Sequence, residues 1–237
     1  MGDRTWSRIW HGGSRPERLT HNGTTQIEPR WPPALAVAAV LVILAVLPHR
    51  LRPFPSWFPY ILGLAVLGPM AAVAVGGARE RWLRTERILG IFFFVVAAAA
   101  TLASLAILIR AMIYRSAETS GLQLLTTSVA QWVTNVLVFS LLYWQIDRGG
   151  PEARANHVSM KPDWLFPQQG AQEDVPAGWH PTFVDYLFLG YVTATAFSPT
   201  DVLPLTARAK LLMMLESSIS LVTLAVVAAR AINVLGN

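Results

Sequence analysis

The sequence predicts an all-α integral membrane protein with about five transmembrane helices plus one re-entrant helix and loop. Apolar residues make up 53% of the 237 residues, charged residues only 14%, and the mean hydropathy is +0.42. Several uncharged runs are long enough to cross a hydrocarbon core of about 30 Å. A short apolar segment that is interrupted by proline near the C-terminus predicts the re-entrant part.

Composition excludes several functional classes. The chain has no cysteine, so it has no disulfide, thiol chemistry or thiolate metal site. Its formal net charge of +5 lies in tails and loops, which indicates contact with lipid headgroups and not with nucleic acid. No HExxH, GxSxG or paired-acid pattern occurs, so we expect no enzyme, cofactor or metal. The expected location is a plasma membrane of bacterial type.

The N-terminal half divides into a polar arm and three helices. Residues 1–30 have no apolar period and predict a flexible arm. Residues 31–116 form the three-helix membrane region, and Gly68 and Pro69 predict a kink in its second helix. The predicted helices lie between Arg30 and His49, from Trp57 to about Val75, and from Ile88 to about Tyr114.

A fourth helix, from Leu122 to Ile146, carries a polar side at membrane depth. Because unpaired polar groups are costly in hydrocarbon, this side is expected to face protein. Hydrogen bonds between helices are the favoured interpretation, and direct contact with an ion or substrate is the alternative. The side comprises Thr127, Gln131, Thr134 and Asn135.

A linker at 147–180 follows, rich in proline, glycine and charge. Asp147, two glycines and Pro151 end the preceding helix. Trp164, Phe166 and Trp179 indicate either a structured cap over one end of the helices or a loop lying on the membrane surface. Both interpretations remain open at this level.

The stretch from Thr182 onwards predicts a helix that enters the membrane and returns. Thr182 with Asp185 three residues later marks a helix start. Pro199 cannot continue a helix, so the segment covers only about half of a bilayer. A full-length apolar helix follows. The predicted parts of this region are a helix at 182–194, a loop at 195–201 and a long helix at 206–235.

These residues resemble the pore module of two-helix potassium channels, in which an outer helix, a pore helix, a selectivity filter and an inner helix follow one another. The resemblance covers residues 181–235, and it implies a pore module at 119–237 that assembles as a tetramer. Where potassium filters have Val-Gly-Tyr-Gly, this chain has Phe197, Ser198, Pro199 and Thr200. The matching positions are Asp185, Tyr186, Val192, Thr193, Thr195, Asp201, Pro204 and Thr206.

The altered filter predicts weak choice among monovalent cations. Stacked inward carbonyls need backbone angles that glycine adopts readily, and Ser198, Pro199 and Thr200 replace that freedom. A ring of Asp201 carboxylates in a tetramer would attract cations, whereas the alternative role of Asp201 is to cap the loop. The candidate filter-like loop comprises Thr193, Thr195, Ala196, Phe197, Ser198, Pro199, Thr200 and Asp201.

The inner helix carries a polar stripe of Glu216, Ser220 and Thr223. Glu216 lies about 15 Å down this helix, and an ionisable group at that depth indicates a functional site. The stripe either lines a pore or hydrogen-bonds to threonines of the pore helix, and the second interpretation is slightly favoured.

Charge counting and the resemblance disagree on orientation. Of the 19 Lys and Arg residues, 14 lie in the arm, the 79–87 loop, the linker and the start of the last helix, and 5 lie on the other side. The positive-inside rule therefore places the linker in the cytoplasm, whereas potassium channels place it outside. An inverted pore, a complete sixth span at 182–199, or a rule weakened by the long arm and linker would each explain this.

The predicted function is a tetrameric pore with weak selectivity for monovalent cations, embedded in the lipid bilayer. The alternative is a non-conducting membrane scaffold or accessory subunit that keeps the pore fold without a working filter.

Overall fold

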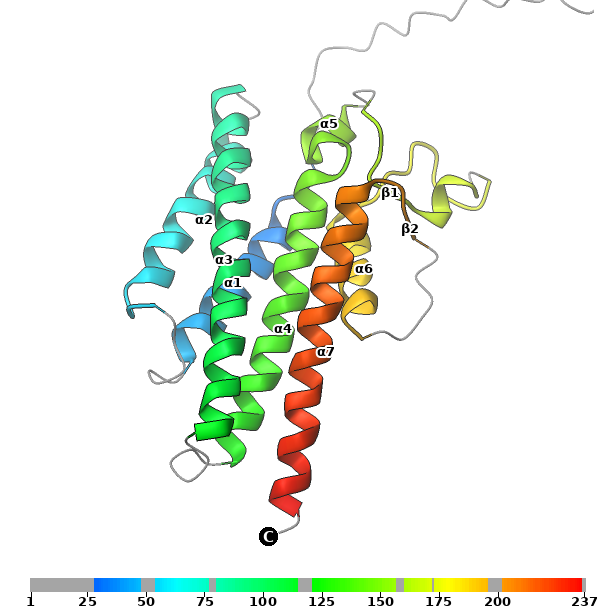
Figure 1. Cartoon of the computed structure of the whole chain (residues 1–237). Helices are drawn as coiled ribbons and strands as arrows, with labels where there is room; N and C mark the ends of the chain where they lie inside the picture. Colours follow the sequence, from blue (N-terminus) through cyan, green and yellow to red (C-terminus); the bar gives the residue numbers. More distant parts are fainter. Residues whose placement is uncertain are drawn as a thin grey trace, which may run out of the picture.

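A computed structural model describes residues 28–47, 54–76, 80–114, 121–156, 160–171, 173–195 and 202–235. Seven α-helices and one pair of short antiparallel strands occur in this part of the chain (Figure 1). The helices are α1 Trp31–Val46, α2 Phe58–Gly76, α3 Glu80–Tyr114, α4 Gly121–Ile146, α5 Pro151–Ala155, α6 Phe183–Thr195 and α7 Ala207–Leu235. The strands are β1 Trp164–Leu165 and β2 Leu203–Pro204.

Three helices are long and apolar enough to cross a membrane. They contain the segments Arg87–Ile107 in α3, Leu125–Gly149 at α4, and Ala207–Ala229 in α7. These three helices indicate an integral membrane protein and confirm the all-helical class. α1 and the apolar part of α2 are shorter. α2 continues unbroken through Gly68 and Pro69, so the kink predicted there does not end the helix.

α4 is the central helix of the bundle. It contacts α1 and α3 on one side and α6 and α7 on the other (Figure 1). Of its membrane segment 56% is buried inside the chain, against 22% for α7. α7 therefore lies at the periphery and presents an apolar face outward.

α1 to α4 alternate in direction, whereas α6 and α7 both begin at the same end, and the connecting segments gather at two ends (Figure 1). The start of α1, the end of α4, the linker and the start of α7 lie together, and we call this the linker end. The end of α3, the start of α4 and the end of α7 lie at the opposite end.

The described part of the linker packs on the linker end as a cap. Trp164 is fully buried, with its ring 4.8 Å from that of Tyr143 and its indole N–H donating to the sulfur of Met213 at 3.3 Å. Phe166 is also buried, 5.3 Å from the ring of Tyr186. These contacts support the structured-cap interpretation over a loop lying on the membrane.

The end of the predicted flexible arm is part of the packed structure. Glu28 and Arg30 are buried to 5% and 6% exposure. The prediction of a flexible arm was wrong for these residues because both side chains pair with oppositely charged groups at the linker end. Residues 1–27 lie outside the described part of the chain.

Candidate functional site

α6 is a half-length helix held between two long ones. Its 13 residues extend about 20 Å. It packs against both α4 and α7, and it is not among the segments long enough to span a bilayer. At its start, the carboxylate of Asp185 accepts hydrogen bonds from the Thr182 amide at 2.7 Å and the Thr182 hydroxyl at 2.8 Å. The predicted pair is confirmed, although the threonine hydroxyl donates to Asp185 and does not cap an amide.

The two ends of α6 lie at different depths. Near its start, the Tyr186 hydroxyl donates to Asp147 Oδ2 at the linker end, at 2.6 Å. Near its finish, the Thr193 carbonyl accepts a hydrogen bond from Ser217 Oγ at 3.1 Å. Ser217 lies ten residues, or about 15 Å, into α7. The chain is described again at Val202, and β2 then pairs with β1 back at the linker end.

Gly190 lets α6 approach α4 closely. A Cβ at this position would collide with Ser140 Oγ and would lie 3.2 Å from the carbonyl oxygen of Val136. Small residues permit such contacts between membrane helices. The same Cβ would lie 3.3 Å from Glu216 Oε1, so Gly190 marks the point where α4, α6 and α7 meet.

Glu216 is fully buried at this meeting point. Its Oε2 atom accepts a hydrogen bond from the Tyr143 hydroxyl at 2.6 Å. The Asn135 amide donates to the Glu216 carbonyl at 3.1 Å and to Ser220 Oγ at 2.9 Å. Thr223 is buried and bonds to the carbonyl of Ile219 in its own helix.

The predicted stripe of Glu216, Ser220 and Thr223 therefore faces the neighbouring helices and not the exposed side of α7. The favoured interpretation, hydrogen bonding inside the protein, agrees with this placement. Its predicted partner needs correction, because the group that donates to Glu216 is Tyr143 of α4 and not a pore-helix threonine. The contact to α6 is instead made by Ser217.

Three buried oxygen atoms near this contact have no hydrogen-bond partner among the described residues: Glu216 Oε1, Asn135 Oδ1 and Thr193 Oγ1. Within the described part of the chain, Glu216 also makes no ion pair with Lys, Arg or His. The interface between α4, α6 and α7 thus holds unused acceptors at membrane depth.

The predicted polar side of α4 is buried throughout, at Thr127, Gln131, Thr134 and Asn135. Gln131 donates to the carbonyl of Thr101 in α3 at 2.8 Å, and Asn135 reaches α7 as described above. Hydrogen bonding between helices is therefore confirmed for these two residues. Tyr143 was missed, although it continues the row of every fourth residue that begins at Gln131.

The filter-like loop is described only at its beginning. Thr193 is buried, and the Thr195 hydroxyl bonds to the carbonyls of Tyr191 at 3.0 Å and Val192 at 3.2 Å. The remaining predicted filter residues lie outside the described residues, and their roles stay predictions: Ala196, Phe197, Ser198, Pro199, Thr200 and Asp201.

Two buried aspartates hold the linker end together. Asp147 accepts hydrogen bonds from the Asp163 amide at 2.7 Å and from the Tyr186 hydroxyl. Asp163 accepts from Thr206 Oγ1 at 2.6 Å and from Arg208 Nε at 2.7 Å, at the start of α7. Burial, together with the negative charge of Asp147, raises the pKa of Tyr186 well above its ordinary value, so this hydroxyl keeps its proton and acts as a donor.

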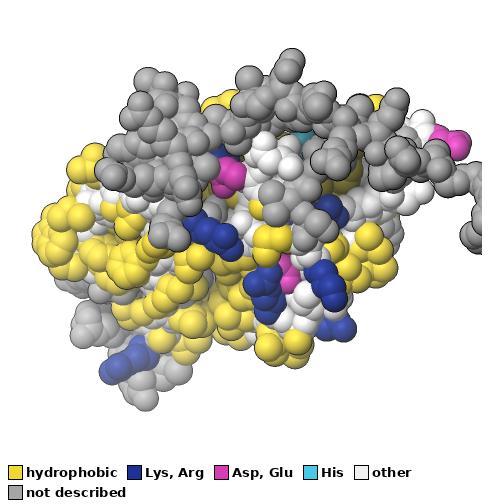
Figure 2. Space-filling view, turned by 90° about the horizontal axis from the view of Figure 1, so that it is seen from above, with side chains coloured by type: hydrophobic (Ala, Val, Ile, Leu, Met, Phe, Trp, Pro, Cys, Tyr) yellow, Lys and Arg dark blue, Asp and Glu magenta, His cyan; other side chains and the backbone are white. Residues whose placement is uncertain are grey.

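A buried ion pair completes the linker end. Arg154 Nε lies 3.2 Å from Glu28 Oε1, and both side chains are almost fully buried. Arg154 also donates to the carbonyls of Trp144 at 2.8 Å and Asp147 at 3.0 Å, so it satisfies the end of α4. Figure 2, which looks onto this end, shows Lys and Arg side chains beside acidic ones, with apolar side chains on either side.

Comparison of the chain with protein-family models, curated proteins and solved structures finds no match. Among the described residues, no group of three or more His, Cys, Asp or Glu side chains is placed to hold a metal ion. The arrangement of α4, α6 and α7 is therefore the feature that bears on function.

Proposed function

We propose that α4, α6 and α7 form the pore module of an oligomeric membrane protein that conducts monovalent cations. The observation that carries this proposal is the placement of α6. This half-length helix begins at the linker end and finishes beside Ser217, and the chain is back at the linker end in β2. These end points support a re-entrant helix over one that crosses the membrane.

The end of α6 supplies a favourable environment for cations. Its last carbonyls form the negative end of the helix dipole, which favours positive charge. This end lies near the middle of the membrane, where low polarity strengthens such effects. Thr193 and Thr195 would contribute oxygen atoms near this point.

In the proposed arrangement five helices span the membrane, and α6 is the re-entrant sixth. α1, with 16 residues, extends about 24 Å, and α2, with 19, about 28 Å. Both lengths suffice where the bilayer thins locally around short helices. α1 and α2 pack on α4 and α3 and on each other, away from α7.

Conduction requires several copies, because one inner helix and one re-entrant loop enclose no pathway. The simplest closed assembly is a fourfold ring. α7 offers an outward apolar face for such contacts, with Leu211, Met214 and Leu221 exposed by 65%, 64% and 70%. Tyr191 and Phe188 of α6 add exposed aromatic surface beside it, at 51% and 58%.

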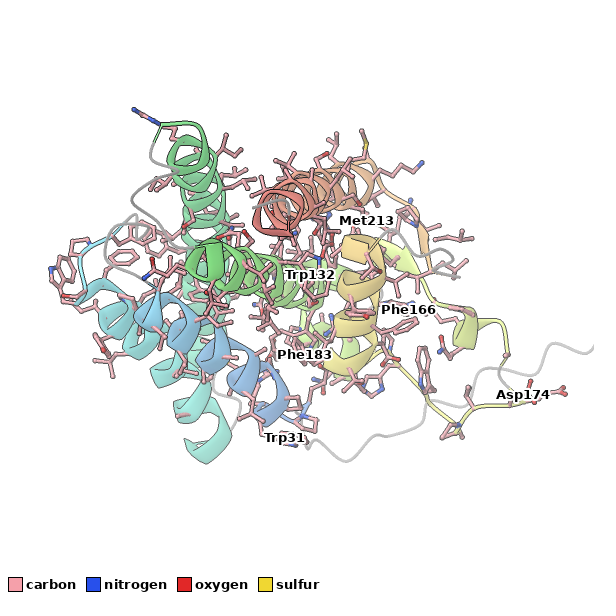
Figure 3. All side chains as sticks on the ribbon, turned by 90° about the horizontal axis from the view of Figure 1, so that it is seen from below. Trp31, Trp132, Phe166, Asp174, Phe183 and Met213 are labelled. Atoms are coloured by element: carbon pink, nitrogen blue, oxygen red, sulfur yellow. The ribbon has the colours of Figure 1, made fainter. Side chains whose placement is uncertain are left out.

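Ion flux through liposomes that contain the purified protein tests this proposal. We expect cation flux, cation over anion preference, and a potassium-to-sodium ratio close to one. In Asp201→Asn the preference for cations should fall. Asp174→Asn is the matched control, because Asp174 is exposed at the tip of the linker, away from the helices (Figure 3).

Two results would contradict the proposal. Flux no greater than in protein-free liposomes would leave the scaffold as the better function. A potassium-to-sodium permeability ratio on the order of a hundred would refute the account of the altered filter.

A further inference from the structure

We infer that the linker end carries a binding site for a small organic anion with a flat apolar body, in the cavity between Arg148 and Trp179. The inference goes beyond conduction and does not depend on it, because all residues involved belong to the cap and not to the pore module's interior.

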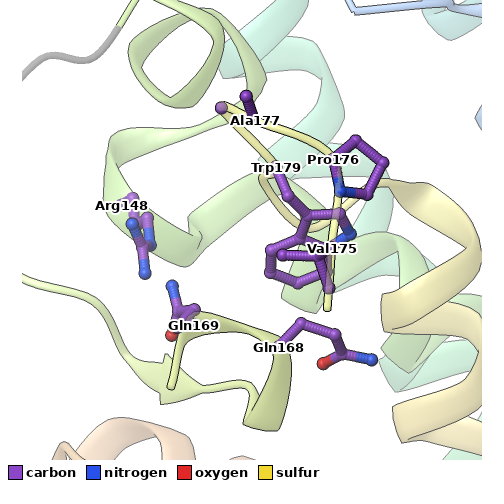
Figure 4. Close-up of a pocket in the computed structure, with 8 residues that line it drawn as sticks. Arg148, Gln168, Gln169, Val175, Pro176, Ala177 and Trp179 are labelled. Atoms are coloured by element: carbon purple, nitrogen blue, oxygen red, sulfur yellow. The ribbon is translucent and has the colours of Figure 1, made fainter. Parts of the chain in front are cut away.

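The cavity has a volume of about 510 Å³, which lies in the range of small-molecule sites. Figure 4 shows Arg148 on one side of it and Val175, Pro176 and Trp179 on the other, with Gln168 and Gln169 below. One wall is therefore cationic and polar, and the opposite wall is apolar and aromatic.

Arg148 has an unusual backbone conformation for an arginine. Its φ of 52° and ψ of 27° lie in the left-handed region, although glycines stand next to it at positions 149 and 150. A residue with a Cβ adopts this conformation only at an energetic cost. Strain of this kind gathers at binding sites, where the side chain is needed despite its cost.

The guanidinium of Arg148 has unused hydrogen-bonding capacity. Its Nε atom is buried without a hydrogen-bond partner among the described residues. Arg148 Nε forms an ion pair with Asp147 Oδ2 at 3.8 Å, a distance that is too long for a hydrogen bond. Both oxygens of Asp147 already accept bonds from Tyr186 and the Asp163 amide. A carboxylate in the cavity would supply the hydrogen-bond acceptor that the Arg148 guanidinium lacks.

The two glutamines complete the polar wall. Gln169 is fixed by a hydrogen bond from the Phe166 amide to its Oε1 atom at 3.1 Å. Gln168 Oε1 is buried without a partner, which adds an acceptor for a hydroxyl or N–H group on the ligand.

The apolar wall is held in place by a turn. The Trp179 amide donates to the Pro176 carbonyl at 3.0 Å, and Gly178 between them has a φ of 76°, which glycine adopts without strain. The Trp179 ring packs edge-on against Phe166 at 6.3 Å. The indole thus offers a fixed flat surface for an aromatic or similarly planar group.

A free anion fits this site better than an anionic lipid. Glu173 and Asp174 are exposed on the same loop but do not line the cavity, so their charges disfavour an approaching anionic bilayer surface more than an anion held beside Arg148. The lining also has no long apolar groove for an acyl chain, since Val175 and Pro176 are followed directly by the turn at Gly178.

Fluorine NMR of the full chain in neutral detergent tests the site, with 4-fluorophenylacetate as the probe. We expect saturable broadening of its signal, with 4-fluorophenylacetamide binding about tenfold more weakly because it lacks the charge. Arg148→Gln should weaken probe binding by about tenfold, since it removes the cation and keeps the same backbone conformation. Arg110→Gln, which changes an exposed arginine at the opposite end, should have no effect.

Trp179→Ala provides a second variant, which should also weaken probe binding by removing the flat wall. Equal binding by wild type, Arg148→Gln and Trp179→Ala would overturn the inference, and so would equal binding of acid and amide. Displacement of the probe by phosphatidylglycerol in nanodiscs, with no displacement by phenylacetate, would assign the cavity to lipid and overturn the free-anion proposal. Failure of this test would leave the flux experiment unaffected.

Discussion

The linker end and the interior of the α4–α6–α7 interface both bury carboxylates, but they stabilise them differently. At the linker end Glu28 meets Arg154, and Asp163 meets Arg208. In the interior Glu216 meets only the hydroxyl of Tyr143 among the described residues. The difference indicates that buried ion pairs fix the helices at the linker end. In the interior the helices are joined by hydrogen bonds, and some buried acceptors have no partner among the described residues.

The largest loss of stability is expected when the buried ion pair between Glu28 and Arg154 is removed. Arg154→Gln leaves Glu28 buried without the Arg154 cation and frees the carbonyls of Trp144 and Asp147, in and just after the end of α4, so it should lower the free energy of unfolding by about 3–5 kcal/mol. Reversible unfolding in mixed micelles measures this free energy. Arg110→Gln, which changes an exposed arginine, is the control. A loss under about 1 kcal/mol would mean that the buried ion pair does not hold the end together.

A smaller loss of stability is expected when the contact between α4 and α6 is disturbed. Gly190→Ala forces a Cβ against Ser140 Oγ, which should cost about 1–3 kcal/mol. Because the shortest contact of this Cβ is with Ser140 Oγ, Ser140→Ala should recover part of that loss in the double variant. Strictly additive effects of the two changes would show that α6 does not pack against α4 at this point.

Asn135→Ala should lower the free energy of unfolding by about 1 kcal/mol, less than Arg154→Gln does. It removes two hydrogen bonds to α7, and such bonds between membrane helices are worth about 0.6 kcal/mol on average. The same unfolding assay applies. A loss as large as that of Arg154→Gln would erase the distinction between the two regions.

Glu216→Gln should have the smallest effect, under about 0.5 kcal/mol, because an amide oxygen can accept the Tyr143 hydroxyl equally well and no cation is lost. Its matched change at the linker end is Glu28→Gln, which should cost several times more. Comparable losses for the two glutamines would reveal a cation at Glu216.

The sequence predicts features that recur at helical spacing. It does not predict contacts between side chains that are far apart along the chain. The polar side of α4 and the short α6 follow from helical spacing and from Pro199, and the structure has both. The pairing of Glu28 with Arg154 joins residues 126 positions apart, and no local pattern indicates it. Tyr143 was missed because a tyrosine in an apolar helix looks like core, although it continues the row from Gln131 and Asn135.

The central claim, that α6 enters the membrane and returns, is tested most directly by single cysteines in this cysteine-free chain. Exposed positions Asp174 and Leu203 flank α6, and exposed Gln123 lies at the opposite end. With a membrane-impermeant maleimide on intact cells, Asp174→Cys and Leu203→Cys should react from one side of the membrane and Gln123→Cys from the other. The same labelling fixes the orientation. Reaction of Asp174→Cys and Leu203→Cys from opposite sides would show that α6 belongs to a complete span and would contradict the re-entrant account.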